Sequence, residues 1–564
     1  MPQAATTRTQ PPRTTTAAGR QGKRKDKATA PKGTVPWLEW GTATLLAVLA
    51  LVLHLTFLIH AGPLWRDEVN TAEIATMPSM SSLLGSLRFD GFPALSVVAL
   101  RGWEALGMGA SDPRIRVFGF IVGLAVLSVT FMACRVLGSR TPLVSLALLG
   151  LNPVAVVTTD SIRPYGLGIV GIVATLALLW RAIELPTRNR FLLAGAMTIF
   201  SVQCMYQNAF LLLGLCLAGV LMLLRSGRRG ATWGVVLVGL VAALSLLPYR
   251  GNIAEMRSWN ALIQTSASMK ELFMAFRFAL GPIENGLLWL ALAALTIYLG
   301  VDALRRKPEQ RASERAPSAA LFCAATLVFT TALFWIAMAA TRLRTQPWYY
   351  VPLMATLAPV LERVGWFVTR QRVWGGIRVL AILGIAAATT FPAWRALQER
   401  RTNVDLVASA VAKEAKPGDA IVVFPWYYGV SFHRYYHGHA GWMTLPPLGD
   451  VRIHRYDLLK VALTQSETMN PLREKVAGAL ESGHRVWLVG GLPPVRTDVP
   501  PDPVPEAPAP KWGWYSQPYL MGWARETAYL IQSHALAAER VPVTTRGAVN
   551  SYEDVPIFVV SGWR

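Results

Sequence analysis

Two adjacent carboxylates, Asp67 and Glu68, follow the first long apolar run of the chain, in the string Gly-Pro-Leu-Trp-Arg-Asp-Glu at 62–68. A charged pair at the end of a membrane helix is costly unless it faces water or a cavity, so it indicates a functional site with a partner. A carboxylate placed there can act as a general base that takes a proton from an attacking hydroxyl. The competing interpretation is a solvated helix end or an N-cap.

Other polar residues lie between later apolar runs. Asp90 precedes Gly91 and is either a substrate-binding residue or a turn residue. Asp160, Arg163 and Tyr165 flank a second junction, where they either bind substrate or form a simple ion pair that caps the helices. We expect these residues to join Asp67 at one site.

The composition indicates a polytopic membrane protein. Hydrophobic residues make up 53% of the 564 residues and charged residues 16%. Apolar runs of about 17 to 25 residues, each long enough to cross the hydrocarbon, recur from Trp37 to Trp394. The net charge of +22 comes from the N-terminal tail and from short loops between apolar runs. This pattern is typical of the positive-inside rule and not of a nucleic-acid-binding protein.

The chain divides into three predicted parts. Residues 1–35 are basic and nearly free of apolar side chains, so we expect a disordered cytoplasmic tail. Residues 36–396 hold the apolar runs and predict an α-helical transmembrane domain. Residues 397–564 predict a small α/β domain, because the helical stretches 405–414 and 472–481 precede the apolar segments 419–424 and 485–489, and 556–560 reads as a last strand. The proline-dense segment 493–510 should be extended.

Charge parity predicts eleven crossings. The segment 92–108 is interrupted by Arg101 and Glu104; if it does not cross, three basic loops fall on the cytoplasmic side together. We therefore expect 92–108 to be an amphipathic helix on the outer interface. The polar loops and residues 397–564 then face outward, and the N-terminus is cytoplasmic. After the first helix at 37–61 the predicted crossings are 116–134, 141–159, 164–182, 190–205, 208–225, 231–249, 285–303, 318–340, 348–364 and 374–394.

One outer loop carries basic residues against this bias. The segment 341–350 reads Thr-Arg-Leu-Arg-Thr-Gln-Pro-Trp-Tyr-Tyr and contains Arg342, Arg344 and Tyr349. Arginines on the outer side indicate an anionic partner, here a lipid phosphate, with ordinary contact to anionic headgroups as the alternative. We expect Tyr349 to contribute to substrate binding.

A histidine-rich cluster falls in the predicted α/β domain. It comprises His433, Tyr435, Tyr436, His437 and His439. Its spacing suits neither a zinc finger nor a helical His-Glu-x-x-His motif, and it lacks a nearby acidic ligand. An acceptor-binding surface that includes His433 and ordinary aromatic packing both remain open. The four cysteines lie in apolar runs and indicate neither a disulfide framework nor a metal site.

Four stretches together resemble a known family. The strings at 64–68, 72–74, 90–95 and 161–165 are similar in order and type to the N-terminal half of the GT-C membrane glycosyltransferases. The likeness is greatest to family 39, which includes the protein O-mannosyltransferases and the lipid A aminoarabinose transferases, and it covers roughly residues 40–365. Members commonly carry histidine or lysine where this chain has Phe92, so no metal or phosphate contact is carried over there.

The resemblance implies inverting transfer of a sugar from a polyprenyl-phosphate donor on the outer face of the cytoplasmic membrane. Asp67 would be the general base beside Glu68, and Arg163, Arg342 and Arg344 would hold the departing phosphate. The acceptor would be a glycan, a lipid or a protein. No cofactor is required by these residues, although a divalent metal is possible.

Two other functions compete with this hypothesis. In a transporter or lipid flippase, Asp67 and Arg163 would be coupling charges, but the charged residues gather at the outer face and no repeated halves or paired broken helices occur. A non-catalytic partner of a transferase is also compatible with the sequence and would require the carboxylates to be dispensable. The sugar, the acceptor and the oligomeric state stay open.

Overall fold

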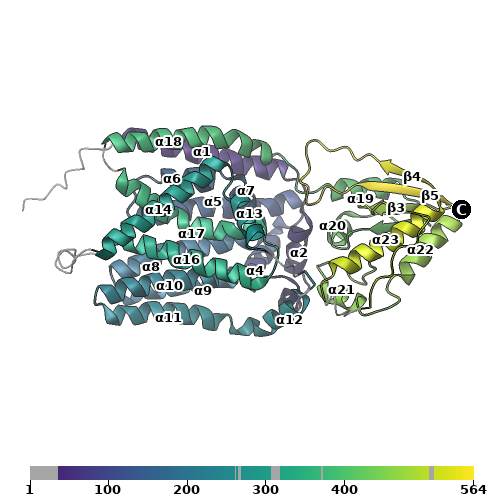
Figure 1. Cartoon of the computed structure of the whole chain (residues 1–564), viewed down its shortest axis with the longest axis horizontal. Helices are drawn as coiled ribbons and strands as arrows, with labels where there is room; N and C mark the ends of the chain where they lie inside the picture. Colours follow the sequence, from purple (N-terminus) through teal and green to yellow (C-terminus); the bar gives the residue numbers. More distant parts are fainter. Residues whose placement is uncertain (1–35, 261, 264–267, 306–317, 370–371, 507–513) are drawn as a thin grey trace, which may run out of the picture.

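The computed structural model describes residues 36–260, 262–263, 268–305, 318–369, 372–506 and 514–564. These residues form two parts that lie end to end along the long axis of the molecule, a bundle of long helices and an α/β part (Figure 1). The basic tail expected at 1–35 lies outside the described residues.

The long apolar runs form the bundle. In a lipid environment each backbone N–H and C=O must be bonded within the segment, which a helix achieves. The long helices are α1 (Pro36–His60), α5 (Asp112–Val136), α8 (Tyr165–Glu184), α9 (Arg188–Cys204), α10 (Asn208–Arg225), α11 (Arg229–Ser245), α14 (Ile283–Arg305), α16 (Ala319–Thr341), α17 (Val351–Val368) and α18 (Arg372–Ala396).

The described residues contain nine helices long and apolar enough to cross a membrane. A bent pair brings the number to ten if it is counted as one span; in it, α6 (Leu143–Ser145) and η3 (Leu146–Gly150) meet α7 (Pro153–Asp160) at 76°. The bend occurs where Asn152 caps α7 and Pro153 begins it. The remaining predicted crossing corresponds to α9, whose 17 residues are at the short end of what spans the hydrocarbon. The chain is a multi-pass membrane protein.

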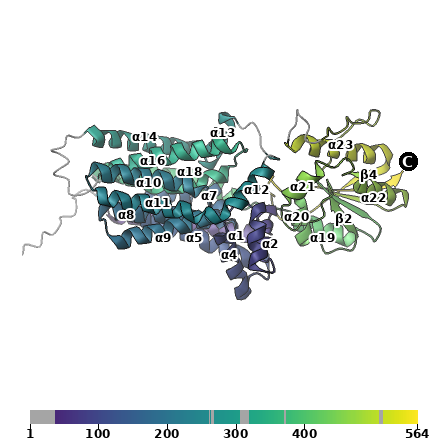
Figure 2. The same ribbon diagram turned by 90° about the horizontal axis from the view of Figure 1, so that it is seen from below.

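A layer of short elements lies between the bundle and the α/β part (Figure 2). The segment 92–108 belongs to this layer and forms the ten-residue helix α4 followed by the π-helix η2. Neither helix is long enough to cross the membrane. The prediction that this segment does not span the membrane is confirmed. The short elements are α2 (Arg66–Ala75), α3 (Met80–Ser86), η1 (Leu87–Phe89), α4 (Ala94–Trp103), η2 (Glu104–Met108), η4 (Leu247–Tyr249), α12 (Arg250–Asn260), α13 (Met269–Ala279) and η5 (Pro347–Tyr350).

The basic loops meet at the opposite end of the bundle. Arg225 donates to the carbonyl of Leu304 at 2.7 Å, and Arg228 donates to the carbonyl of Glu184 at 3.1 Å. The ends of α8, α10 and α14 therefore share one face, far from the α/β part (Figure 1). This agrees with the charge parity on which the crossing count was based.

A five-stranded sheet is the centre of the α/β part, with the order β2-β1-β3-β5-β4. β1 is parallel to β2 and β3, whereas β5 is antiparallel to β3 and β4. The fully buried sequences Ala-Ile-Val-Val of β1 and Val-Trp-Leu-Val of β3 suit central strands covered on both faces. The strands are β1 (Ala420–Val423), β2 (Gly441–Thr444), β3 (Val486–Val489), β4 (Ala535–Val541) and β5 (Ile557–Trp563).

Helices cover this sheet: α19 (Val404–Glu414), α20 (Tyr428–Tyr435), α21 (Tyr456–Ala462), α22 (Asn470–Glu481) and α23 (Gln517–His534). The two predicted helix-then-strand units are α19–β1 and α22–β3, and the predicted last strand is β5. The described part of the proline-dense segment has no helix or strand. Neither β2 nor β4 was predicted from the sequence.

We expect the two ends of the bundle to face opposite sides of the membrane. Cysteine at exposed Ser226, in the turn after α10, should be protected from an impermeant thiol reagent on intact cells, whereas cysteine at exposed Ser482, after α22, should react. The four native cysteines are buried and should stay silent. The measurement is mass tagging before and after permeabilisation. Labelling of position 226 from outside would contradict this orientation.

Candidate active site

Asp67 lies in the first turn of α2, at the junction between the bundle and the α/β part. The chain reverses at Gly62, whose φ of +71° favours glycine, and α2 begins after Trp65. The Asp67 side chain is 30% exposed, and its Oδ1 lies 3.5 Å from Nε2 of His454 and 3.6 Å from Nε of Arg66. The carboxylate therefore contacts residues of both parts.

The surroundings of Asp67 keep it ionised. Burial by itself raises the pKa of Asp67, but the hydrogen bond from His454 and the charges of Arg66 and Arg163 outweigh it. The pKa of Asp67 is thus held well below its usual range. At neutral pH this group is a proton acceptor and cannot donate a proton.

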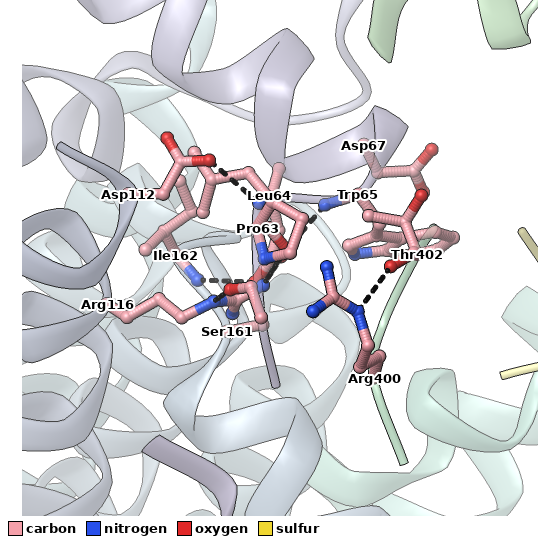
Figure 3. A network of polar contacts seen from close by, with 12 residues as sticks. Pro63, Leu64, Trp65, Asp67, Asp112, Arg116, Ser161, Ile162, Arg400 and Thr402 are labelled. Carbon is pink, nitrogen blue, oxygen red and sulfur yellow. Dashed lines mark hydrogen bonds and ion pairs between the residues drawn. The ribbon is translucent and has the colours of Figure 1, made fainter. Parts of the chain in front are cut away.

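Glu68 occupies a different environment. Its carboxylate is fully buried, pairs with Arg116 of α5 at 3.0 Å, and accepts hydrogen bonds from the backbone N–H groups of Trp65 and Ile162. Arg116 also donates to the carbonyl of Gly62 at 2.6 Å. Figure 3 shows that Asp67 points away from Arg116. Glu68 does not share a site with Asp67 as expected. Its carboxylate is already bound by Arg116 and by two backbone N–H groups.

Arg163 and Asp90 are brought to Asp67 as expected. Arg163 pairs with Asp90 at 3.1 Å, and it also donates to Thr71 Oγ1 at 2.7 Å and to the backbone carbonyl of Asp67 at 3.1 Å. Burial lowers the pKa of Arg163, but the carboxylates of Asp90 and Asp67 outweigh it and raise this pKa above its ordinary value. Arg163 is therefore a permanent cation beside Asp67.

Asp160 lies elsewhere. Its carboxylate is buried in the bundle and pairs with Nδ1 of His54 on α1 at 2.7 Å. A Cβ atom at Gly123 would lie 1.8 Å from Asp160 Oδ1, so glycine permits this close approach. The ion pair with Arg163 that was the alternative is not formed, because Asp160 pairs with His54 instead.

Aromatic side chains form an apolar wall beside Arg163. Tyr165 is buried and lies 5.3 Å from the ring of Phe92 and 6.4 Å from that of Tyr349. Arg163 lies over the ring of Phe92 at 4.8 Å. The predicted residues Tyr165 and Tyr349 thus belong to one cluster, and Phe92 takes part in it through its ring.

Three predicted site residues lie at a distance from Asp67. Arg342 and Arg344 follow α16 with exposed side chains and have no polar partner among the described residues. His433 is exposed on α20, where its neighbour is the ring of Trp442 at 6.3 Å. None of the three has a contact with Asp67.

The rest of the histidine-rich cluster joins the two parts of the molecule. Tyr435 donates to Asp112 Oδ2 at 2.6 Å. The neighbouring Arg434 pairs with Glu73 at 3.1 Å and with Asp112 at 2.8 Å. This arrangement corresponds to the aromatic packing that was left open. Within the described ranges, no group of three His, Cys, Asp or Glu side chains is suited to hold a metal ion.

Two site residues were not found from the sequence. His454 follows α20 as an isolated histidine, and its only signal was the polar string Arg-Ile-His-Arg-Tyr-Asp at 452–457. Arg401 follows the last bundle helix and lies over the ring of Trp65 at 5.0 Å. Its position on the predicted outer side is the same departure from the charge bias that singled out Arg342.

Arg401 is a cation without a bonded anion. In the described part of the chain no acceptor lies within hydrogen-bond distance of its guanidinium, although Glu68 and Asp67 are near. Burial lowers the pKa of Arg401, and the carboxylate of Glu68 only partly offsets this. Beside it, Glu553 accepts from the backbone N–H of Arg66 at 3.1 Å, and burial raises the pKa of Glu553 to about 7.

Comparison with solved structures identifies the fold. The chain superposes on ArnT from Cupriavidus metallidurans in the apo state with a TM-score of 0.50 and 13% identity, covering 80% of this chain and 93% of that one. For the same protein bound to undecaprenyl phosphate the TM-score is 0.49 and the identity 14%, and the match covers 80% of this chain and 93% of that one. For the Archaeoglobus fulgidus oligosaccharyltransferase tethered to an acceptor peptide the TM-score is 0.47 and the identity 12%, and the match covers 92% of this chain and 74% of that one.

The expected GT-C fold is confirmed by the likeness to ArnT. At such low identity this likeness concerns the fold alone. No known sequence family matches the chain, and no curated protein sequence matches it. The roles of its site residues therefore depend on the geometry.

The buried pair of Glu68 and Arg116 should support the loop that carries Asp67. Arg116→Met leaves a buried carboxylate without its cation, which should destabilise the protein by about 3 to 5 kcal/mol. The double variant with Glu68→Leu should recover part of this loss. The measurement is the free energy of unfolding in denaturant for the detergent-solubilised protein. Arg181→Ala, which removes an exposed ion pair, is the control and should cost less than about 1 kcal/mol; equal effects would contradict this role.

Proposed function

We propose that this protein is a membrane glycosyltransferase that moves a sugar from a polyprenyl-phosphate donor to an acceptor hydroxyl. The observation that carries the proposal is an ionised aspartate, Asp67, with Arg66, Arg163 and Arg401 near it. This site lies at the end of a bundle with the GT-C fold. A base and a cluster of cations are the two requirements of a displacement that expels a phosphate.

In the proposed reaction the acceptor oxygen attacks the anomeric carbon as the bond to the phosphate breaks. The leaving phosphate takes the bonding electron pair, and the hydroxyl proton passes to Asp67. The low pKa of Asp67 makes it a weak base, so we assign proton transfer to a late stage. By then the attacking oxygen has become acidic through its bond to the sugar, whose transition state resembles an oxocarbenium ion. Such a displacement inverts the anomeric centre.

The cations have different roles in this proposal. Arg163 is bound by Asp90 and Thr71, so it fixes the backbone of Asp67 and supplies charge. Arg401 has no competing acceptor among the described residues and is our choice for direct contact with the phosphate. Exposed Arg342 and Arg344 are assigned to the entry of the lipid headgroup. Glu68 is assigned to holding the loop.

We place this reaction on the outer face of the cytoplasmic membrane, with the N-terminus inside and the α/β part outside. Nucleotide sugars are absent there, which is why a lipid-linked donor is required. The positive-inside rule supports this orientation, because the basic loops lie at the end of the bundle far from Asp67.

One observation favours a transporter as the second candidate. The pair of His54 and Asp160 lies within the bundle, and ionisable residues at that depth often belong to proton pathways. A transporter would show no glycosyl transfer by the wild-type protein. Purified protein in nanodiscs with a radiolabelled polyprenyl-phosphate sugar separates the two functions.

Asp67→Asn should abolish most transfer. The change keeps the size of the side chain and removes the proton acceptor, so the rate should fall by about 10² to 10⁴. Asp498→Asn, which alters an exposed carboxylate of the α/β part, is the matched control and should be neutral. Near-normal transfer by Asp67→Asn would show that another group is the base, with His454 as the next candidate.

Arg401 should control the use of the donor. Loss of one charge-assisted contact in Arg401→Ala should cost about 1.5 to 3 kcal/mol, or roughly ten- to a hundredfold in kcat/KM for the donor. Arg401→Lys should restore only part of this, because lysine keeps the charge and loses the planar fork. Arg342→Ala is the control at the headgroup entry and should have the smaller effect. If instead Arg342→Ala is the more damaging, the phosphate lies nearer to α16.

A further inference from the structure

A pocket lies at the junction of the bundle and the α/β part, and none of its lining residues belongs to the candidate active site. Its volume is about 420 Å³, within the range of small-molecule sites. Its walls come from η1 and α12 on the side of the bundle and from α21 and Trp514 on the side of the α/β part. The residues that matter here are Arg88, Glu255, Trp259, Asp457, Lys460 and Trp514.

Two tryptophans line this pocket, Trp259, which is buried, and Trp514, whose ring is the more open of the two. Trp259 is fixed, because it stacks on Tyr456 at 4.4 Å with an interplanar angle of 8° and donates from Nε1 to the carbonyl of Arg88 at 2.7 Å. Trp514 is partly exposed, with Lys460 Nζ at 4.7 Å from its ring. Flat aromatic faces of this kind pack against the C–H faces of sugar rings.

The charges of the pocket balance. Arg88 and Lys460 are cationic, while Glu255 and Asp457 are anionic, and Arg88 forms an exposed ion pair with Glu255 at 3.4 Å. A wall of equal and opposite charges favours a neutral ligand rich in hydroxyl groups, which can both donate to carboxylates and accept from cations. It disfavours a phosphate or a strongly charged peptide.

Both walls are close in sequence to residues of the candidate active site. Arg88 is two residues before Asp90, which binds Arg163. On the other wall, Asp457 is three residues after His454, which binds Asp67. In space the two are linked by Tyr456, whose ring stacks on Trp259 of the pocket and lies 5.9 Å from the ring of His454.

We propose that this pocket binds a neutral oligosaccharide, and that the acceptor of the reaction is therefore a glycan. The identification of the ligand as the acceptor rests on the proposed function, whereas the binding of a saccharide does not. In this arrangement one unit of the acceptor packs on the ring of Trp514, and a neighbouring unit presents its hydroxyl to Asp67.

The test is binding of neutral trisaccharides to the full-length protein in nanodiscs, by saturation-transfer NMR. The probes are mannotriose, arabinotriose and triacetylchitotriose, with inorganic phosphate as the charged comparison. At least one trisaccharide should bind, and Trp514→Ala should weaken it about tenfold. Thr464→Trp, which fills the pocket from an exposed position, should abolish binding. Trp563→Ala removes a tryptophan of β5 outside the pocket and is the control.

The outcomes separate the two proposals. Absence of binding by every trisaccharide, preference for phosphate, or equal binding by Trp514→Ala, Thr464→Trp and the control would overturn the saccharide site. Asp67→Asn should retain trisaccharide binding while transfer is lost. If the wild-type protein binds a trisaccharide and transfers no sugar, the site stands and the proposed function fails. If it does transfer, the acceptor KM should rise about tenfold in Trp514→Ala with little change in kcat.

Discussion

The buried ion pair between Glu68 and Arg116 is the interaction on which the rest of the junction depends. It closes the loop after α1 onto α5, and it reaches the start of the next polar segment through the N–H of Ile162. Two charges in so dry a place are tolerated only because backbone groups satisfy their remaining hydrogen bonds. With this loop fixed, α2 begins at a defined point and Asp67 can face only one way.

The candidate site is assembled from segments distant in the sequence. Asp67 follows the first bundle helix, Arg163 precedes α8, and His454 comes from the α/β part. Contacts across the junction hold these segments together, among them Arg434 with Asp112 and the carboxyl of Glu553 at the N-terminus of α2. A helix N-terminus favours such a group, because its free N–H donors need acceptors. Each part alone would present an incomplete constellation.

Much of the fold could be predicted, because lipid demands long uninterrupted helices and leaves a strong pattern in the sequence. The failure of 92–108 to cross and the two helix-then-strand units followed from charge and periodicity, whereas the placement of Asp90 with Arg163 followed from the family resemblance. The four-residue strand β2 has no such pattern. The strand β4 has mostly exposed side chains, and a strand without a buried face is not distinguished by alternation.

Site residues were harder to predict wherever a competing partner decided the outcome. Asp160 was expected near Arg163, but the small residues of α5 let it approach His54 instead. Glu68 and Asp67 are neighbours in sequence, yet Glu68 turns into the bundle and Asp67 turns toward the α/β part. The only signal for His454 was the polar string around it, and a lone histidine in a polar loop is compatible with many roles.

The long separation between Asp67 and His454 also affects how the protein matures. During synthesis Asp67 emerges with the first membrane helix, whereas His454 and Glu553 are made only after the last one. N-terminal segments fold first on the ribosome, so the bundle can form around an aspartate that still lacks its histidine. Docking of the α/β part is then the step that completes the constellation. Under the function proposed above, a chain truncated before the α/β part would hold Asp67 without His454, so the reaction would wait until the α/β part has docked.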